Sequence, residues 1–418
     1  MARAVLLLGL VSILHAQQGD QGLLSEVRAK VADSVRRLSN YMCTENIERT
    51  VYALKAAAQS TESCADLLTA KGHGRLLSSD RLRLDVGTSK SDEMYSWAGE
   101  KRFYDRRPGE IVGHGATSNG SFTALLSMIF TSDPVRFSYV GEFTQAEHQL
   151  VEFAFEAPVE RSHYTFAQRF RVITAYEGTF LVDPKTWDLV RLTIHTKGLP
   201  PESGACEAAN TTDYQNVHLN NSTLLLPSLV RLVIVNTDGS ESVNQTVFSA
   251  CREFQGQSAV TFGDVSKAPT SNSVLAPAEL AVRKGLPFEV ALTQDIDTSK
   301  AAAGDAVKCE LVTPIRAGRN LVVPAETPVT ARIVELRRTY GPPSSLSLSL
   351  RLESLDLDGT VRTIAAHAKG VVRRREPWPA PVRQSGTGED HELTIVFPDP
   401  TGKMVIKTGL RTDWITGP

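Results

Sequence analysis

The chain has 418 residues, which is more than one hydrophobic core normally supports, so two domains are the default expectation. Its 45 basic and 47 acidic residues give a formal net charge of -2, and 41% of the residues are hydrophobic. A charge this close to zero gives no support for nucleic acid or an anionic membrane as a partner. The composition is that of an ordinary globular protein.

The first residues have the pattern of a secretory signal peptide. Arg3 precedes an apolar run of about 11 residues, and the small residue Ala16 comes before a polar stretch. The run is too short for a membrane span, which needs roughly 20 residues. We therefore expect residues 1–16 to be removed on export to the periplasm or the cell exterior, leaving a mature chain without a transmembrane segment.

Export places five cysteines in a compartment where disulfides persist. None of them forms a CxxC motif, so zinc and thioredoxin chemistry are not expected. The simplest pairing joins Cys43 with Cys64 and Cys206 with Cys251, because each pair stays within one neighbourhood of the chain. Cys309 is then left over, and its alternating strand pattern predicts a buried free thiol that packs as a small hydrophobe.

The first regular element after the leader is an amphipathic helix. Its apolar residues recur at spacings of three and four over about 20 residues: Leu23, Leu24, Val27, Val31, Val35, Leu38 and Met42. From Thr44 the apolar period changes to two, which predicts a strand to Leu54 and another at residues 82–86. We expect the helix to lie on the sheet that these strands begin.

Residues 166–196 give the clearest architectural signal in the chain. Apolar residues alternate from Phe166 to Val182 and resume after Asp183-Pro184, where proline takes the second position of a type I turn. This pattern predicts one long strand, a tight turn and a return strand. We expect a curved antiparallel sheet, decorated by helices, to be organised around this hairpin.

Residues 121–130 interrupt the strand pattern with a short, almost wholly apolar helix that ends at Asp133-Pro134. A helix that is apolar on all sides must be buried on most of them. Two interpretations remain open: a core helix that plugs the sheet, or one wall of an apolar cavity with the sheet as its floor. Such a cavity would be dry, would suit acyl chains, and would be lined by Leu125, Leu126, Ile129, Phe130, Phe153, Phe155, Phe180 and Val182.

Residues 263–275 are small, polar and proline-containing, which is the composition of a linker. The sequence thus predicts a first domain over residues 20–262 and a second over residues 276–418. In the second, short alternating strands are separated by close turns, and residues 345–355 alternate almost perfectly. This spacing is typical of a small β-sandwich or β-barrel, so the whole chain is expected to be mostly β with a few helices.

The first domain resembles the LolA-type lipoprotein carriers and the related periplasmic lipid-binding half-barrels. The resemblance lies in the layout, a helix followed by a long antiparallel meander, and in the hairpin GTFLVDPKTWDLVRL. It implies a half-barrel that holds a lipid or a lipidated protein. The domain also resembles secreted proteins of soil bacteria such as Acidobacteria, in Tyr41-Met42-Cys43 and in FSACREFQGQS around Cys251, and that resemblance implies no activity.

The second domain is similar to the barrel of TrbI-type conjugation proteins. The similarity lies in PFEVALTQDIDTSKAAAGDAVKCELVTPI followed by LVVPAETPVTARIVEL, in which an acidic turn, a Gly-Asp turn and a proline turn recur in the family's order. Ala325-Glu326 stands here where that family has Lys-Gly after Pro324. The similarity implies a β-barrel that contacts other envelope proteins.

No stretch of the chain carries a catalytic motif. His391-Glu392 has Ile395 where a zinc-protease helix needs its second histidine, and no Gly-x-Ser-x-Gly turn occurs. Asp295 and Asp297 fit a turn whose carboxylates accept backbone N–H groups better than a calcium site. The sequence therefore predicts no catalytic residue, no metal and no cofactor.

Three classes of function remain open. The first is a non-catalytic envelope protein that holds a lipid or a lipidated protein in its first domain and contacts other envelope proteins through its second. The second is a structural or assembly module without a small ligand. The third is a hydrolase with dispersed site residues, which a polar cleft gathering histidines and carboxylates would favour.

Overall fold

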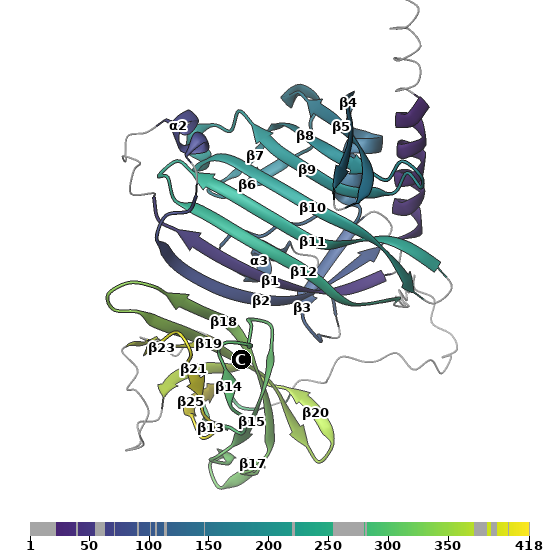
Figure 1. Ribbon diagram of the computed structural model, residues 1–418. Coiled ribbons are helices and arrows are strands. Elements are labelled where there is room, and N and C mark those ends of the chain that lie inside the picture. Colours follow the sequence, from purple (N-terminus) through teal and green to yellow (C-terminus); the bar gives the residue numbers. More distant parts are fainter. Residues whose placement is uncertain are drawn as a thin grey trace, which may run out of the picture.

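The computed structural model describes most of the chain as antiparallel strands (Figure 1). The described residues are 22–38, 41–54, 63–70, 72–89, 92–100, 102–104, 107–112, 115–145, 147–219, 222–253, 280, 282–371, 383–385, 391–399 and 401–417. The signal peptide at residues 1–16 and the linker at residues 263–275 lie outside these ranges. Both stay predictions, and so does the division into domains.

One long antiparallel sheet forms the N-terminal half. Each strand pairs with the next in the spatial order β4 (Arg136–Gln145), β5 (His148–Ala157), β8 (Ala175–Val182), β9 (Leu189–Lys197), β10 (Ala205–Leu219), β11 (Ser222–Asn236), β12 (Glu241–Glu253), β1 (Tyr41–Tyr52), β2 (Leu76–Ser89), β3 (Asp92–Trp97). Buried residues alternate along β1, as one covered face requires. The predicted sheet, antiparallel and not closed on itself, is confirmed (Figure 1).

The hairpin β8–β9 is present with the predicted turn. The Asp183 side chain accepts hydrogen bonds from the N–H groups of Lys185 (2.7 Å) and Thr186 (3.3 Å), which fixes the reversal. The prediction of one continuous strand from Phe166 is wrong, because residues 165–173 form a separate small hairpin. Its strands are β6 (Thr165–Ala167) and β7 (Arg171–Ile173), and Phe166 lies opposite Val172. Phe166 and Val172 are separated by an even number of residues because they pair with each other across a turn, and not because they share one face of a single strand.

The N-terminal helix covers residues 22–37 and buries Val27 and Val31 against the sheet. Its predicted extension to Met42 is wrong. Met42 belongs to β1, where it pairs with Gly87 on one side and Arg252 on the other. Strand pairing on both sides gives the backbone N–H and C=O groups of this segment hydrogen-bond partners. A helix that continued to Met42 would remove this pairing.

The apolar helix predicted at residues 121–130 is also present. It consists of α4 (Ala124–Ser127) and the π-helical turn η1 (Met128–Ser132), which we call together the plug helix. The other short helices are α2 (Cys64–Thr69), α3 (Pro108–Val112), η2 (Val159–Arg161) and η3 (Pro201–Ser203). The plug helix is the apolar one among them, and it lies in the core.

Four of the five cysteines form disulfides, but the simplest pairing is wrong. Cys43 is bonded to Cys251, and Cys64 is bonded to Cys206. The first pair is 208 residues apart in sequence yet adjacent in space, because β1 and β12 are neighbouring strands. Proximity in sequence does not predict proximity in a sheet whose first strand pairs with a late one. Cys309 is free and buried, as predicted.

The C-terminal half consists of strands around a second apolar core that includes Trp414. Successive neighbours are β21 (Ala366–Val371), β25 (Arg411–Thr416), β13 (Pro287–Leu292), β15 (Ala306–Leu311), β18 (Pro328–Thr339), β19 (Ser345–Leu357), β23 (Glu392–Pro398) and β22 (Arg383–Ser385). Small pairings complete it: β19 with β20 (Thr360–Thr363), β14 (Ile296–Asp297) with β24 (Val405–Ile406), and β16 (Ile315–Ala317) with β17 (Asn320–Val323). The expected succession of short strands is confirmed.

The two halves meet along strand β2. The end of β18 pairs with the beginning of β2. The Arg83 N–H donates to the Ala303 carbonyl (2.7 Å), and the Ala303 N–H donates to the Arg81 carbonyl (2.9 Å). Gly304 follows with φ +105°, and a Cβ at this position would collide with the carbonyl oxygen of Arg83. Only glycine permits such a close approach of the two backbones.

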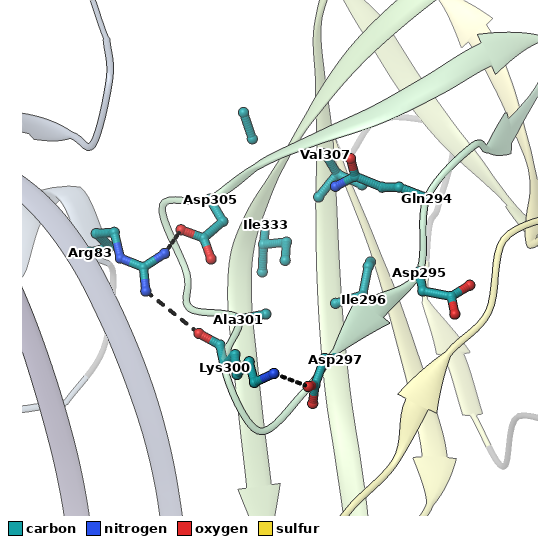
Figure 2. A pocket seen from close by; sticks show the side chains of 11 residues that line it. Arg83, Gln294, Asp295, Ile296, Asp297, Lys300, Ala301, Asp305, Val307 and Ile333 are labelled. Atoms are coloured by element: carbon teal, nitrogen blue, oxygen red, sulfur yellow. Dashed lines mark hydrogen bonds and ion pairs between the residues drawn. The ribbon is translucent and has the colours of Figure 1, made fainter.

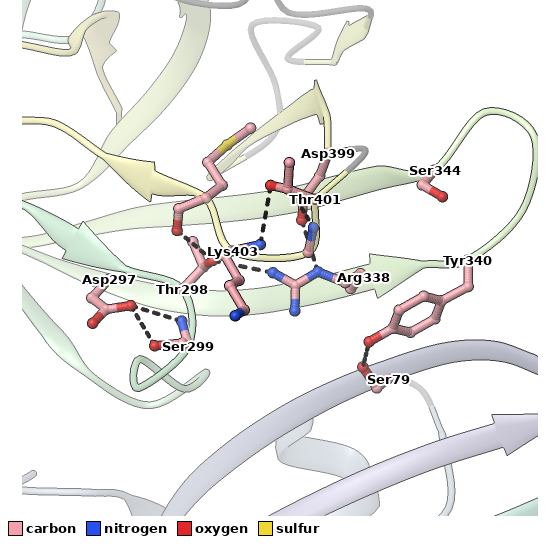
Figure 3. Close-up of polar contacts among 12 residues, drawn as sticks. Ser79, Asp297, Thr298, Ser299, Arg338, Tyr340, Ser344, Asp399, Thr401 and Lys403 are labelled. Atoms are coloured by element: carbon pink, nitrogen blue, oxygen red, sulfur yellow. Dashed lines mark hydrogen bonds and ion pairs between the residues drawn. The ribbon is translucent and has the colours of Figure 1, made fainter.

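Side chains extend this seam. The guanidinium of Arg83 pairs with the Asp305 carboxylate (Figure 2), and the hydroxyls of Ser79 and Tyr340 are 3.0 Å apart (Figure 3). Arg332 is buried, pairs with Glu353 of its own half, and donates to the Ala98 carbonyl of the other half at 3.1 Å. The seam is therefore a polar network built around buried arginine.

Replacing Arg332 with alanine should lower the free energy of unfolding by about 3 to 5 kcal/mol, because the carboxylate of Glu353 and two backbone carbonyls lose a buried partner. Urea-induced unfolding measures the change. The control is Arg136→Ala, which removes an exposed ion pair with Glu156 and should change stability by less than about 1 kcal/mol. Equal effects of the two substitutions would contradict a structural role for the seam.

Candidate functional site

All eight residues predicted to line an apolar cavity lie in one buried cluster. The cluster joins the plug helix to the sheet, and it also contains Val27 and Val31 of the N-terminal helix. Leu126, Ile129 and Phe180 have no exposed surface. The structure thus brings together the residues that the sequence selected, at the contact between the plug helix and the floor of the sheet.

Aromatic rings contribute to this contact and to the floor of the sheet below it. The ring centroids of Phe130 and Phe180 are 5.1 Å apart with nearly perpendicular planes, and those of Phe153 and Phe180 are 5.1 Å apart and stacked. Both arrangements are favourable for aromatic pairs. The plug helix is therefore packed directly on the sheet, and an acyl chain would have to replace ring contacts to lie between them.

The cluster reaches the surface at strand β4. Phe137 is partly buried, and its ring lies 6.0 Å from that of Phe130 and 6.1 Å from that of Phe180. Farther along β4, Tyr139, Val140 and Phe143 are exposed. The Tyr139 ring lies 5.8 Å from that of the buried Phe153, which stacks on Phe180, so apolar side chains lead from an exposed position of β4 to the fully buried Phe180.

Arg28 of the N-terminal helix lies at this outer end. Its guanidinium carbon is 5.8 Å from the centroid of the Phe137 ring, and its Nε donates to the Phe130 carbonyl at 3.0 Å. The sequence analysis did not select Arg28 or Phe137 for the site. The alternation that places Phe137 in a strand was visible, but nothing in the sequence brings that strand next to the N-terminal helix.

A carboxylate holds each end of the plug helix. Before the helix, Glu93 accepts the N–H groups of Gly120 (2.7 Å) and Phe122 (2.9 Å), and a carboxylate is favourable at a helix N-terminus. After the helix, the buried Asp133 accepts the hydroxyl of Tyr176 at 2.8 Å. The apolar segment is thus positioned by polar contacts at both ends.

A second carboxylate is buried beside Glu93. Glu45 lies on the covered face of β1, and its Oε2 atom has no hydrogen-bond partner among the described residues. Burial raises the pKa of Glu45 well above its ordinary value, and the nearby charge of Glu93 raises this pKa further. Folding therefore favours the protonated form of Glu45. Burial and the two carboxylates also raise the pKa of the Tyr95 hydroxyl, which donates to Glu93.

A separate polar pocket of about 440 Å³ lies at the seam between the halves (Figure 2). Its charged side chains already have partners. Lys300 pairs with Asp297, and Asp295 pairs with Lys407 and accepts the Thr408 N–H. Asp297 accepts the Ser299 N–H within its own turn, as predicted, whereas the partners of Asp295 come from a distant part of the chain. The described residues contain no group of three or more histidine, cysteine or acidic side chains placed to hold a metal ion.

Among the described residues, the histidines that pair with carboxylates are dispersed over the structure. The histidine–carboxylate pairs lie on different elements: His73 with Glu241, His163 with Asp133, and His195 with Glu207. A hydrolytic site needs a nucleophile or an activated water, a base and an oxyanion donor within reach of one reacting atom. The arrangement of these pairs does not favour the hydrolase alternative.

No family model matches the chain, and no curated protein matches it. Among solved structures it is similar to an outer membrane lipoprotein-sorting protein domain from Vibrio parahaemolyticus, with a TM-score of 0.28, 9% identity, and coverage of 56% of this chain and 93% of that one. It is also similar to a DUF1329 family protein from Desulfovibrio piger, with a TM-score of 0.28, 7% identity, and coverage of 58% and 94%. TM-scores and sequence identities this low do not support an inference about function.

Across the part of the chain that the structure describes, no helix has both the length and the apolar character needed to span a bilayer.

Replacing Glu45 with glutamine should stabilise the protein at neutral pH. Below the pKa of the unfolded chain, about 4.3, both states are protonated and Glu45 has no effect. Above it the unfolded chain ionises while the fold keeps its proton, so stability falls as the pH rises toward the folded pKa. Glutamine does not ionise, so the substitution removes this loss of stability. We expect the free energy of unfolding to rise by about 1 to 3 kcal/mol at neutral pH.

Urea-induced unfolding at neutral pH and at about pH 4 measures this effect, and the gain should shrink at the lower pH. Glu93→Gln is the matched control, because Glu93 is used as a charged acceptor at the N-terminus of the plug helix and its replacement should destabilise. A Glu45→Gln variant that is less stable than the parent at neutral pH would show that Glu45 is needed as an anion.

Proposed function

We propose that this protein is an exported, non-catalytic envelope protein that binds an acyl chain, from a lipid or a lipidated protein, between the plug helix and the sheet. The observation that supports this is the continuity of the apolar cluster, which runs from the exposed Tyr139 of β4 through Phe153 to the fully buried Phe180, with the partly buried Phe137 beside Phe180. An acyl chain that follows this line stays in contact with apolar groups along its whole length.

The energetics are compatible with a plug helix that moves. Each CH₂ group that leaves water contributes about 0.8 kcal/mol, so a long acyl chain can offset the loss of a few ring contacts. The plug helix is short and ends in a π-helical turn, an irregularity often found at functional sites. A helix this short depends on tertiary packing for its stability. It can therefore repack as a unit around a ligand.

One observation favours a second function, that of a structural or assembly module without a small ligand. Leu126 and Ile129 are completely buried against the sheet, as in an ordinary closed core. In that case the plug helix is simply part of the core, and the C-terminal half contacts other envelope proteins. The acyl-binding proposal likewise assigns the contacts with other envelope proteins to the C-terminal half.

Replacing Ile129 with aspartate should abolish acyl binding, because a charge would then lie where the chain must pass. Thr131→Asp is the matched control: it adds the same charge on the same helix at an exposed position and should leave binding unchanged. Binding of a fluorescent fatty acid measures the effect, and thermal unfolding shows whether each variant is folded. Native mass spectrometry of protein from its own envelope should detect a co-purifying lipid.

Leu126→Trp separates the two functions. If the plug helix opens onto a ligand site, the larger side chain fills that site and lowers acyl binding. Binding of no acyl chain by the parent, or unchanged binding by a stably folded Leu126→Trp variant, would remove the carrier proposal and leave the structural one.

A further inference from the structure

We propose that Arg28 selects the ligand's headgroup, so that the acyl site takes a single-chain lipid with an anionic headgroup, such as an ionised fatty acid. This inference rests on the proposed function and adds the chemical class of the ligand. Arg28 is exposed, and it lies beside the partly buried Phe137, between the N-terminal helix and β4.

Arg28 differs from the other basic residues of its helix. Lys30 pairs with Asp188 at 3.2 Å, while Arg36 and Arg37 both pair with Asp33. Within the described part of the chain, Arg28 has no carboxylate within ion-pair distance. Its positive charge is therefore the one on this helix that a ligand can neutralise.

The geometry leaves the two Nη groups of Arg28 able to bind a ligand. Nε is used by the Phe130 carbonyl, and among the described residues the two Nη groups donate to no carboxylate. A carboxylate or phosphate can accept two parallel hydrogen bonds from the two Nη groups of one arginine. The guanidinium carbon lies over the Phe137 ring at 5.8 Å from its centroid, within the range of a cation–π contact.

The position also fits the amphipathic nature of such a ligand. The Phe137 ring centroid lies 5.8 Å from the guanidinium carbon, 6.0 Å from the centroid of Phe130 and 6.1 Å from that of Phe180. A headgroup at Arg28 thus places the first carbon atoms of the chain against Phe137, at the entrance to the cluster. A neutral headgroup would gain the apolar contacts but not the charge-assisted hydrogen bonds.

Titration calorimetry with dodecanoate and dodecanol, at a mildly alkaline pH where the carboxyl group is ionised, tests this inference. The parent protein should bind dodecanoate about tenfold more tightly than dodecanol, as expected for charge-assisted hydrogen bonds. Arg28→Gln should lower the affinity for dodecanoate to that for dodecanol and leave dodecanol unchanged. Arg36→Gln, on the same helix, should keep the preference.

The outcomes separate the two proposals. Equal binding of both ligands by the parent, or a preference for dodecanoate that survives in Arg28→Gln, would overturn the role of Arg28 and leave acyl binding intact. Binding of neither ligand would overturn the acyl-binding function together with this inference. Thermal unfolding of Arg28→Gln and Arg36→Gln shows whether both variants retain the fold.

Discussion

The pairing of β1 with β12 on one edge and with β2 on the other is the constraint on which the N-terminal half depends. It closes a loop that contains most of this half, and the Cys43–Cys251 disulfide fixes it covalently. Closing so long a loop costs chain entropy, which a disulfide reduces by restricting the unfolded chain. The order of all other strands in the sheet follows from this closure.

One result of that order is the position of the plug helix. β3 lies at one end of the sheet and β4 at the other, so the chain between them must cross the covered face. That connection contains α3 and the plug helix. The apolar character of residues 124–132 is thus a consequence of topology, because this segment runs over the interior side of the strands and must match the phenylalanines that they present.

The covered face is nevertheless not uniformly apolar. Near β1 and β3 it carries Glu45 and Glu93, and toward β5 and β8 it carries mainly hydrocarbon and aromatic groups, with the Tyr176–Asp133 hydrogen bond at the end of the plug helix. The polar end fixes the start of the plug helix by satisfying backbone N–H groups that would otherwise be unpaired. The other end is fixed as well, because the buried Asp133 accepts the Tyr176 hydroxyl and Arg28 donates to the Phe130 carbonyl. Between these two ends the plug helix packs on the sheet through hydrocarbon and aromatic groups, without directional bonds.

The sequence by itself determined the features that depend on neighbouring residues. These include the β8–β9 hairpin with its Asp183 turn, the buried apolar helix, the long alternating strand β19, and the eight side chains that meet where the plug helix packs on the sheet. Alternation and helical periodicity report which face of an element is buried, and they do so without knowledge of its partners.

Only the tertiary structure decided which elements meet. It set the cysteine partners, the adjacency of Glu45 and Glu93, the seam around Arg332, and the contact of Arg28 with Phe137. Each of these contacts joins residues from separate strands or helices. Many strand orders bury the same alternating faces equally well, so a pattern along the chain cannot choose among them. The choice is made by packing and by the pairing of every buried polar group, which exist only in the assembled fold.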